Sequence, residues 1–319
     1  MHSAALSEMY SIDNKSIERL LPSLRNCPDS VTYYNLLNAA LSSYLYPVNQ
    51  SLSKKDTRKL LLFLPKLYDG GMYFFFQGND SMALKLFSTV IDLGKKDKVD
   101  KFPTRWLGQS AYCSSLLLYG RSQYKEACNM AKIAMTDSDI TEDASEIELS
   151  SLKKMMNTPD DSLKYYAELL TLHSTFLHNT FFLFELADYY NSSNQYAKLS
   201  SLADTLLLAD SLNKQAWYFK GLGLLHQDSL EQALPFLRKA VSLDSCYEQP
   251  RYALAQCYSV LADSKASRGN ARNSCLALAI QQLTVLKTID PNQINVDWMT
   301  LWKRLRLLTA KKDRNEKSK

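Results

Sequence analysis

The sequence predicts an all-α fold in which antiparallel helix pairs stack in series. Glycine and proline occur only 9 times each in 319 residues, which leaves too few turn-forming residues for a sandwich or barrel of many short strands. Apolar residues recur at helical spacing along most of the chain, and a pattern of small and large residues repeats about every 34 residues. A composition of 46% hydrophobic and 22% charged residues supplies a sizeable core and excludes a disordered chain.

Residues 1–63 are expected to form N-terminal capping helices. Residues 17–24 and 31–46 read as a helix pair, and either Asp29 or Ser30 is suited to cap the second helix. The first ten residues lack a basic segment followed by an apolar run, so we expect no signal peptide in the chain as given. A cytoplasmic location is the default expectation, and no apolar run is long enough to predict a membrane span.

The clearest repeat unit covers residues 213–245. Marker residues at helical spacing define its two helices: Trp217, Gly221 and Leu224 on the first, and Ala233, Leu237 and Ala240 on the second. A small side chain lets two helix backbones approach, and a large one fills the space beside it. Asp228 and Glu231 have the spacing of a capping box and predict the start of the second helix.

Six such units are expected over residues 64–291. They begin near residues 64, 108, 146, 180, 214 and 248. In the unit near 146, Thr158 as a cap, Pro159 and the acidic pair Asp160–Asp161 predict the start of the second helix. Two insertions interrupt the period, a charged one at residues 95–103 and a loop at residues 263–274.

The C-terminal end is expected to close the array. Residues 292–310 are predicted to form a capping helix, because Trp298, Trp302 and Leu305 lie at helical spacing. A repeat array needs such caps, since each helix pair leaves an apolar face that a neighbour must cover. Residues 311–319 form a charged tail that we expect to be solvated.

A 34-residue helix–turn–helix with small and large residues at fixed places resembles the tetratricopeptide-repeat (TPR) family. The resemblance covers about 70% of the chain and implies a right-handed helical solenoid that serves as a non-catalytic protein-interaction scaffold. Tyr165 and Leu199 stand where the second helices of this family usually carry a small residue. The two middle units should therefore pack less closely than their neighbours.

No constellation in the sequence predicts catalysis or metal binding. The chain contains no Walker motif, no dinucleotide-binding glycine motif and no GxSxG. His173 and His178 are five residues apart, a poor spacing for a shared metal ion, and Gly221-Leu222-Gly223 lies within a helix, where packing explains it. The six cysteines form no CxxC pattern, which predicts buried free thiols. We expect no enzyme activity, no cofactor and no metal.

The remaining candidate site is a surface. In TPR-like arrays the first helices line a concave side, and the resemblance places one residue of each unit there: Tyr68, Tyr112, Ser150, Phe184, Tyr218 and Tyr252. Tyrosine offers a broad contact area with a polar tip, which suits an extended peptide or a partner helix. The alternative reading is that these rings pack between adjacent first helices and stabilise the array.

One helical turn after this aromatic column lies a second set of positions. Its members are Met72, Leu116, Lys154, Asp188, Leu222 and Gln256. Some TPR proteins hold the C-terminal carboxylate of a partner with lysine and asparagine residues on these helices. This set has a single lysine and no asparagine, so we do not expect that mode of binding. We predict an aromatic groove with polar points at Lys154, Asp188 and Gln256.

A protein or peptide partner is therefore expected. The alternative is a helical-repeat protein that binds RNA or single-stranded DNA through basic side chains and exposed tyrosines. The net charge of +5 comes from 38 basic and 33 acidic residues with no basic face apparent, which makes nucleic acid the less favoured partner. Self-association through the terminal helix that bears Trp298 and Trp302 is a separate hypothesis.

Overall fold

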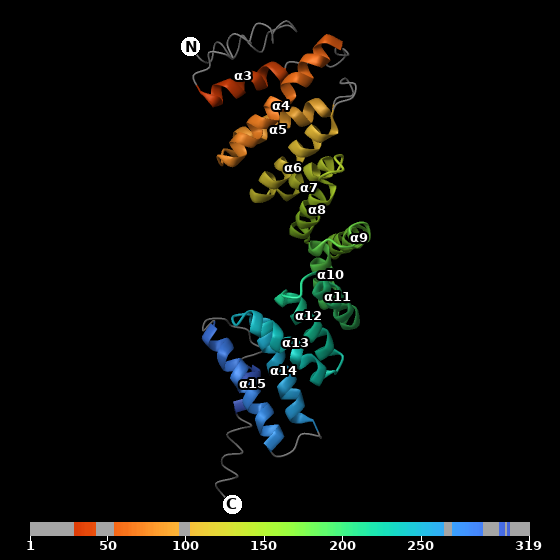
Figure 1. The fold of residues 1–319 in the computed structure, drawn as a ribbon, viewed down its shortest axis with the longest axis vertical. Helices are drawn as coiled ribbons and strands as arrows, with labels where there is room; N and C mark the ends of the chain where they lie inside the picture. Colours follow the sequence, from red (N-terminus) through yellow and green to blue (C-terminus); the bar gives the residue numbers. More distant parts are fainter. Residues whose placement is uncertain are drawn as a thin grey trace, which may run out of the picture. The chain divides into compact units, whose positions relative to one another are not determined.

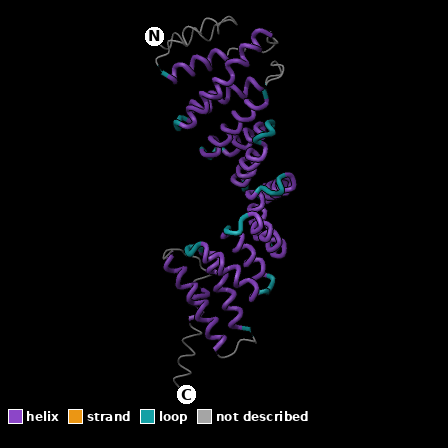
Figure 2. Tube along the Cα trace, viewed as in Figure 1, coloured by secondary structure: helices purple, strands orange, loops and turns teal. Residues whose placement is uncertain are grey.

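The computed structural model describes residues 29–42, 54–95, 103–264, 270–289, 300–303 and 305–306. Within these residues the chain consists of helices joined by turns, and no strand is formed (Figures 1 and 2). The all-α prediction is confirmed.

The chain divides into two compact units, residues 1–176 and 177–319. The described helices of the first unit are α3 (Ser30–Ser42), α4 (Lys54–Phe76), α5 (Asp80–Gly94), α6 (Thr104–Gly120), α7 (Tyr124–Ala134), α8 (Thr141–Met155) and α9 (Pro159–Thr175). Those of the second are α10 (Thr180–Ser192), α11 (Tyr196–Ala209), α12 (Lys214–His226), α13 (Leu230–Leu243), α14 (Glu248–Asp263) and α15 (Asn270–Ile289). Within each unit a helix packs mainly against its neighbours in sequence, as a series of helix pairs does.

The 34-residue period is regular in the second unit. The first helices α10, α12 and α14 begin at Thr180, Lys214 and Glu248, so successive starts lie 34 residues apart. The second helices α11 and α13 begin at Tyr196 and Leu230, again 34 residues apart. One core runs through the unit, and the buried Leu305 beyond α15 belongs to it.

The turns of the α4–α5, α6–α7, α10–α11 and α12–α13 pairs each contain a left-handed residue. Their φ angles are +70° at Gly78, +60° at Ser122, +58° at Asn194 and +56° at Asp228. Asp228 is thus a turn residue, because a left-handed backbone does not have the conformation of an N-cap. The predicted Asp228–Glu231 capping box is wrong: the N-cap of α13 is Ser229, whose side chain makes no capping hydrogen bond.

Two other predicted caps are confirmed. The Thr158 hydroxyl accepts a hydrogen bond from the Asp161 amide at 3.2 Å, and the Asp161 carboxylate accepts one from the Thr158 amide at 3.0 Å. Pro159 occupies the first turn of α9, as expected. At α3, the Asp29 carboxylate accepts a hydrogen bond from the Thr32 amide at 2.8 Å, so Asp29 caps this helix.

Small residues let the helices approach where the sequence pattern placed them. A Cβ atom added at Gly221 would lie 2.6 Å from Leu237 Cγ, so the close contact of α12 with α13 requires glycine there. A Cβ atom at Gly223 would lie 2.9 Å from the carbonyl oxygen of Tyr196 on α11. The Gly221-Leu222-Gly223 segment therefore brings α12 close to both of its neighbours, and its interpretation as a packing motif is confirmed.

The middle helix pairs are the looser ones. Tyr165 and Leu199, which replace small residues on α9 and α11, are both buried. Helix α8 contacts α9, and α10 contacts α11, less extensively than α6 contacts α7 or α12 contacts α13. The two large residues predict this looser packing. The division between the two units also falls here, between Phe176 and Leu177.

The second predicted insertion contains helical residues. Helix α14 continues to Asp263 and α15 begins at Asn270, so residues 270–274 are helical rather than part of a loop. Arg272 on α15 pairs with Asp263 at 3.8 Å, which ties the two extended helix ends together. Residues 96–102 of the charged insertion, residues 17–24, Trp298 and the charged tail lie outside the described residues.

Candidate functional site

The predicted aromatic column is half-buried in each unit. In the first unit, Tyr68 on α4 has its ring 5.1 Å from Trp106 on α6 and 6.0 Å from Phe87 on α5. Burial raises the pKa of Tyr68 to about 12. Tyr112 packs beside the small core formed by α6 and its neighbours, and burial together with the charge of Asp143 raises its pKa. Both phenols are neutral at pH 7 and serve in part as packing between helices.

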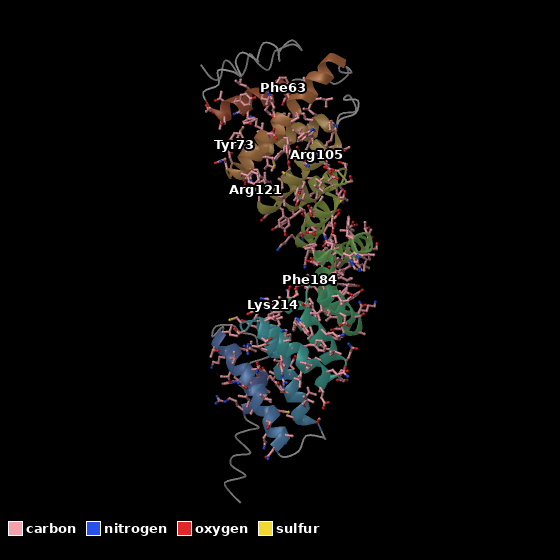
Figure 3. All side chains as sticks on the ribbon, in the orientation of Figure 1. Phe63, Tyr73, Arg105, Arg121, Phe184 and Lys214 are labelled. Atoms are coloured by element: carbon pink, nitrogen blue, oxygen red, sulfur yellow. The ribbon has the colours of Figure 1, made fainter. Side chains whose placement is uncertain are left out.

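In the second unit the column continues on α10, α12 and α14. Phe184 lies 6.4 Å from Phe219, centroid to centroid, which links α10 to α12. Tyr218 packs beside Phe219, and Tyr252 on α14 is half-buried against the same core. Figure 3 labels Phe184 on α10 and Lys214 at the start of α12. The rings contribute to packing and still keep part of their surface exposed.

Asp188 and Gln256 are the polar points of this unit. Asp188 on α10 is exposed and Gln256 on α14 is half-buried. Burial, with smaller contributions from Tyr196 and Asp188, raises the pKa of Tyr218 to about 12. The charge of Asp188 also contributes to the raised pKa of Tyr247, after burial and Tyr218. The fold thus brings Tyr218 together with Tyr247, a residue that the sequence does not mark as part of the column.

Tyr247 departs from the repeat in a way that is visible in the sequence. It is the N-cap of α14, where the two preceding first helices have Asn179 and Asn213, each accepting a capping hydrogen bond. Tyr247 cannot cap α14 in this way, and its ring instead packs 5.6 Å from Tyr218 at an interplanar angle of 66°. An aromatic residue at a capping position was the signal that could have found it.

A cation already lies against the Tyr247 ring. Lys214 Nζ is 5.4 Å from the ring centroid and donates a hydrogen bond to the carboxylate of Asp244. The lysine lowers the pKa of Asp244, first through this hydrogen bond and also through its charge.

The other basic side chains of these first helices are held by partners. Lys220 pairs with Asp204 on α11 at 2.7 Å, and Arg251 donates to the Ser245 carbonyl at 2.7 Å and to Gln282 on α15 at 3.0 Å. His226 stacks on Tyr196 at 3.9 Å, and burial lowers its pKa, so it is neutral at pH 7. Lys220 and Arg251 are therefore engaged by groups of this chain.

A buried glutamate in the first unit pairs with an exposed lysine. Glu148 on α8 is 4% exposed and pairs with Lys132 on α7 at 3.2 Å. Burial raises the pKa of Glu148, and Lys132 opposes that rise. Between the ordinary pKa of glutamate, near 4.3, and this raised value, the folded chain holds a proton that the unfolded chain has lost.

Glu148→Gln should therefore gain stability relative to the wild type as pH rises from 4 to 7. When the pH is above the pKa of Glu148 in the folded protein, the wild type carries a buried negative charge that lowers its free energy of unfolding. Glutamine never ionises, so the variant does not lose this stability. Urea unfolding at several pH values measures the difference. In a Lys132→Met background the difference should widen, because the neighbour that favours the carboxylate is gone. A difference that is constant with pH would contradict this account.

The described residues contain no group of three or more histidine, cysteine, aspartate or glutamate side chains placed to hold a metal ion. Cys113, Cys128 and Cys257 are buried free thiols, as predicted, whereas Cys246 is exposed. Among the helices that the structure describes, none has the length and apolar character needed to cross a bilayer.

Comparison with known proteins gives distant similarity. No protein-family model matches the chain. The DnaJ homolog subfamily C member 7 homolog of Dictyostelium discoideum is 29% identical over 147 residues, 45% of this chain and 26% of that protein. The human DnaJ homolog subfamily C member 7 is 27% identical over 103 residues, 32% of this chain and 21% of that protein. The chain thus matches about a quarter or less of the length of these relatives.

Among solved structures, the APC/C hetero-tetramer Cut9–Hcn1 is similar at 16% identity and a TM-score of 0.49, over 95% of this chain and 58% of that one. A TPR repeats protein from Bacteroides fragilis is similar at 14% identity and a TM-score of 0.33, over 77% of this chain and 98% of that one. The fold is assigned from the architecture of the chain itself. Helix pairs recur every 34 residues in the second unit, and small residues on one helix face large residues on the next. By this architecture the chain has a tetratricopeptide-repeat-like fold of stacked helix pairs.

Proposed function

We propose that this protein is a non-catalytic scaffold that binds a peptide or a partner helix along the first helices of its second unit. TPR proteins generally mediate protein–protein interactions and are typically non-catalytic. The observation that supports this surface is the run of half-buried rings at equivalent places on three successive first helices, Phe184, Tyr218 and Tyr252. Rings held by the core are already ordered, so binding a partner costs little side-chain entropy.

Two polar residues of this surface would orient the bound partner. Asp188 and Gln256 each lie one helical turn beyond a ring of the column, on α10 and α14. A few rings would supply most of the affinity, and the polar groups would fix the orientation of the partner. In the first unit, Tyr68 and Tyr112 occupy the matching places on α4 and α6, and we propose them as a second contact surface.

Site-specific photo-crosslinking tests this proposal. A photoreactive phenylalanine analogue is placed at Tyr252, and in a matched protein at Leu208, which is 89% exposed on the second helix α11. In lysate of the native organism, Tyr252 should crosslink to a discrete protein and Leu208 should not. For that partner, once purified, Tyr252→Ala should weaken binding about tenfold or more while Leu208→Ala leaves it unchanged.

The controls separate binding from folding. Circular dichroism and the unfolding midpoint must show that the Tyr252→Ala protein remains folded, because this ring also contacts the core. Equal crosslinking at both positions, or a discrete product at Leu208 alone, would contradict the proposal. Crosslinking of the Tyr252 position to RNA instead of protein would favour the nucleic-acid alternative.

A further inference from the structure

We propose that the protein pairs with a second copy of itself through the exposed face of helix α4. The two helices run antiparallel, so that Lys66 of each copy meets Asp69 of the other and Leu62 of each copy meets Tyr73 of the other. This contact belongs to the first unit, and it does not depend on the peptide binding proposed for the second unit.

The exposed face of α4 carries large apolar side chains. Its residues follow one another at alternating steps of four and three, the spacing of a helix–helix contact, and we call them the α4 stripe: Leu62, Lys66, Asp69, Tyr73 and Phe76. The exposed fractions of Leu62, Tyr73 and Phe76 are 71%, 46% and 76%, and Figure 3 labels Tyr73. On the opposite side of α4, Leu64 and Leu67 lie in the core of the first unit. Large apolar side chains that gather on one exposed face mark a protein contact.

The two charged residues of the α4 stripe have no ion-pair partner in the part of the chain that the structure describes. Lys66 lies against the ring of Phe63, with its Nζ atom 5.4 Å from the centroid, and both Lys66 and Asp69 are exposed. The two residues are close in sequence, yet they do not pair with each other. A surface that covers the apolar residues of the stripe must therefore offer one negative and one positive charge between its own apolar groups.

The α4 stripe is complementary to itself in one orientation. Lys66 and Asp69 are centred on the same point of the helix as Leu62 and Tyr73, midway between residues 67 and 68. A two-fold axis through that point brings each member of both pairs opposite its counterpart in the other copy, so one register forms both contacts twice. A parallel pair of helices would instead place lysine against lysine and aspartate against aspartate. The charges therefore select the antiparallel arrangement.

The size of the stripe indicates a reversible dimer. From Leu62 to Phe76 it covers about 21 Å of helix, at about 1.5 Å per residue. A contact of this length is small for a permanent dimer, so association should depend on protein concentration. Exposed ion pairs add little free energy, because water and salt screen them. The apolar residues would thus supply most of the affinity, and the charges would fix the orientation and the register.

Charge reversal in the full-length protein tests the pairing. Sedimentation equilibrium from low-micromolar to near-millimolar concentration should show the mass of the wild type rising from one chain towards two. Lys66→Asp makes acids face acids and Asp69→Lys makes lysines face lysines, so each change alone should weaken association about tenfold or more. An equimolar mixture of the two variants should dimerise again, because the acidic stripe of one meets the basic stripe of the other. The double exchange within one chain should also restore the dimer.

Two further variants separate the stripe from general effects of charge. Asp92→Lys reverses an exposed acid on α5 of the same unit and should leave association unchanged. Leu62→Ala removes an apolar contact without changing the charge and should weaken association several-fold. All of these side chains are exposed, so circular dichroism should show the same helix content in every variant.

The outcomes that would overturn the inference are distinct. A wild type that keeps the mass of one chain at every concentration would exclude the dimer. A dimer that survives both Lys66→Asp and Asp69→Lys would place the contact on another surface. A mixture that associates no better than either variant alone would show that the two residues do not meet. The photo-crosslinking at Tyr252 is read separately, so peptide binding by the second unit stands or fails independently of these results.

Discussion

Replacing Gly223 by valine is expected to destabilise the second unit by about 3 kcal/mol or more, because the new side chain meets backbone atoms of a neighbouring helix. A Cβ atom at this position would lie 2.9 Å from the Tyr196 carbonyl oxygen and 3.0 Å from the Ser200 amide nitrogen, both on α11. Backbone atoms cannot rotate away as the end of a side chain can. Relief would need the two helices to separate, which would open the core they share.

Urea unfolding followed by circular dichroism measures this effect. Gly120→Ala is the matched control, because Gly120 ends α6 with no heavy atom within 4 Å of its added Cβ. Reduced freedom of the unfolded chain should leave the control unchanged or more stable by up to about 1 kcal/mol. An equally small effect of Gly223→Val would mean that α11 and α12 do not need their close approach.

The sequence was sufficient to predict the fold class and the places where helices touch. Small and large residues at fixed spacing mark the places where helices approach, and Gly221 and Leu237 are both such markers in their repeat. The structure shows that these two residues face each other. The looser packing around Tyr165 and Leu199 was predictable for the same reason, since a large side chain at a close contact forces two helices apart.

The errors arose where local chemistry allows two readings. Asp228 followed by Glu231 fits a capping box, but aspartate also tolerates the left-handed backbone that the tight turn requires at this place. The repeat itself indicates the right reading, since Asn194 occupies the same left-handed turn one period earlier. The 34-residue period predicts a loop at residues 270–274, because a regular repeat has no place for a longer helix there, yet α15 extends through them.

The candidate site was predictable only in part. The periodicity marks Phe184, Asp188, Tyr218 and Tyr252 because they occupy equivalent places on successive helices. Tyr247 falls outside those places, since it lies in the turn before α14, and only the folded chain shows that its ring packs against Tyr218. Sequence periodicity therefore finds the residues on the helix faces and misses those that the connecting turns bring to the same surface.

The second large effect is expected at Phe87 in the first unit. Phe87 is fully buried and its ring lies over Gly71, where an added Cβ would approach Phe87 Cε1 to 2.4 Å. Phe87→Ala should cost about 3–5 kcal/mol, because it removes a buried ring and leaves a cavity beside α4. Gly71→Ala alone should cost about 1–3 kcal/mol, because its methyl group collides with the ring.

The double variant distinguishes paired packing from two independent defects. With the ring removed, the methyl group at position 71 enters the cavity that Phe87→Ala leaves, so Gly71→Ala with Phe87→Ala should be less destabilised than the sum of the single changes by about 1 kcal/mol or more. Gly120→Ala combined with Phe87→Ala should be additive within about 0.5 kcal/mol. If the losses of stability caused by Gly71→Ala and Phe87→Ala were strictly additive, the packing of Phe87 would not be the reason that position 71 requires glycine. Coupling would establish that a small residue facing a large one is the unit of stability in this array, as the same arrangement at Gly221 and Leu237 implies for the second unit.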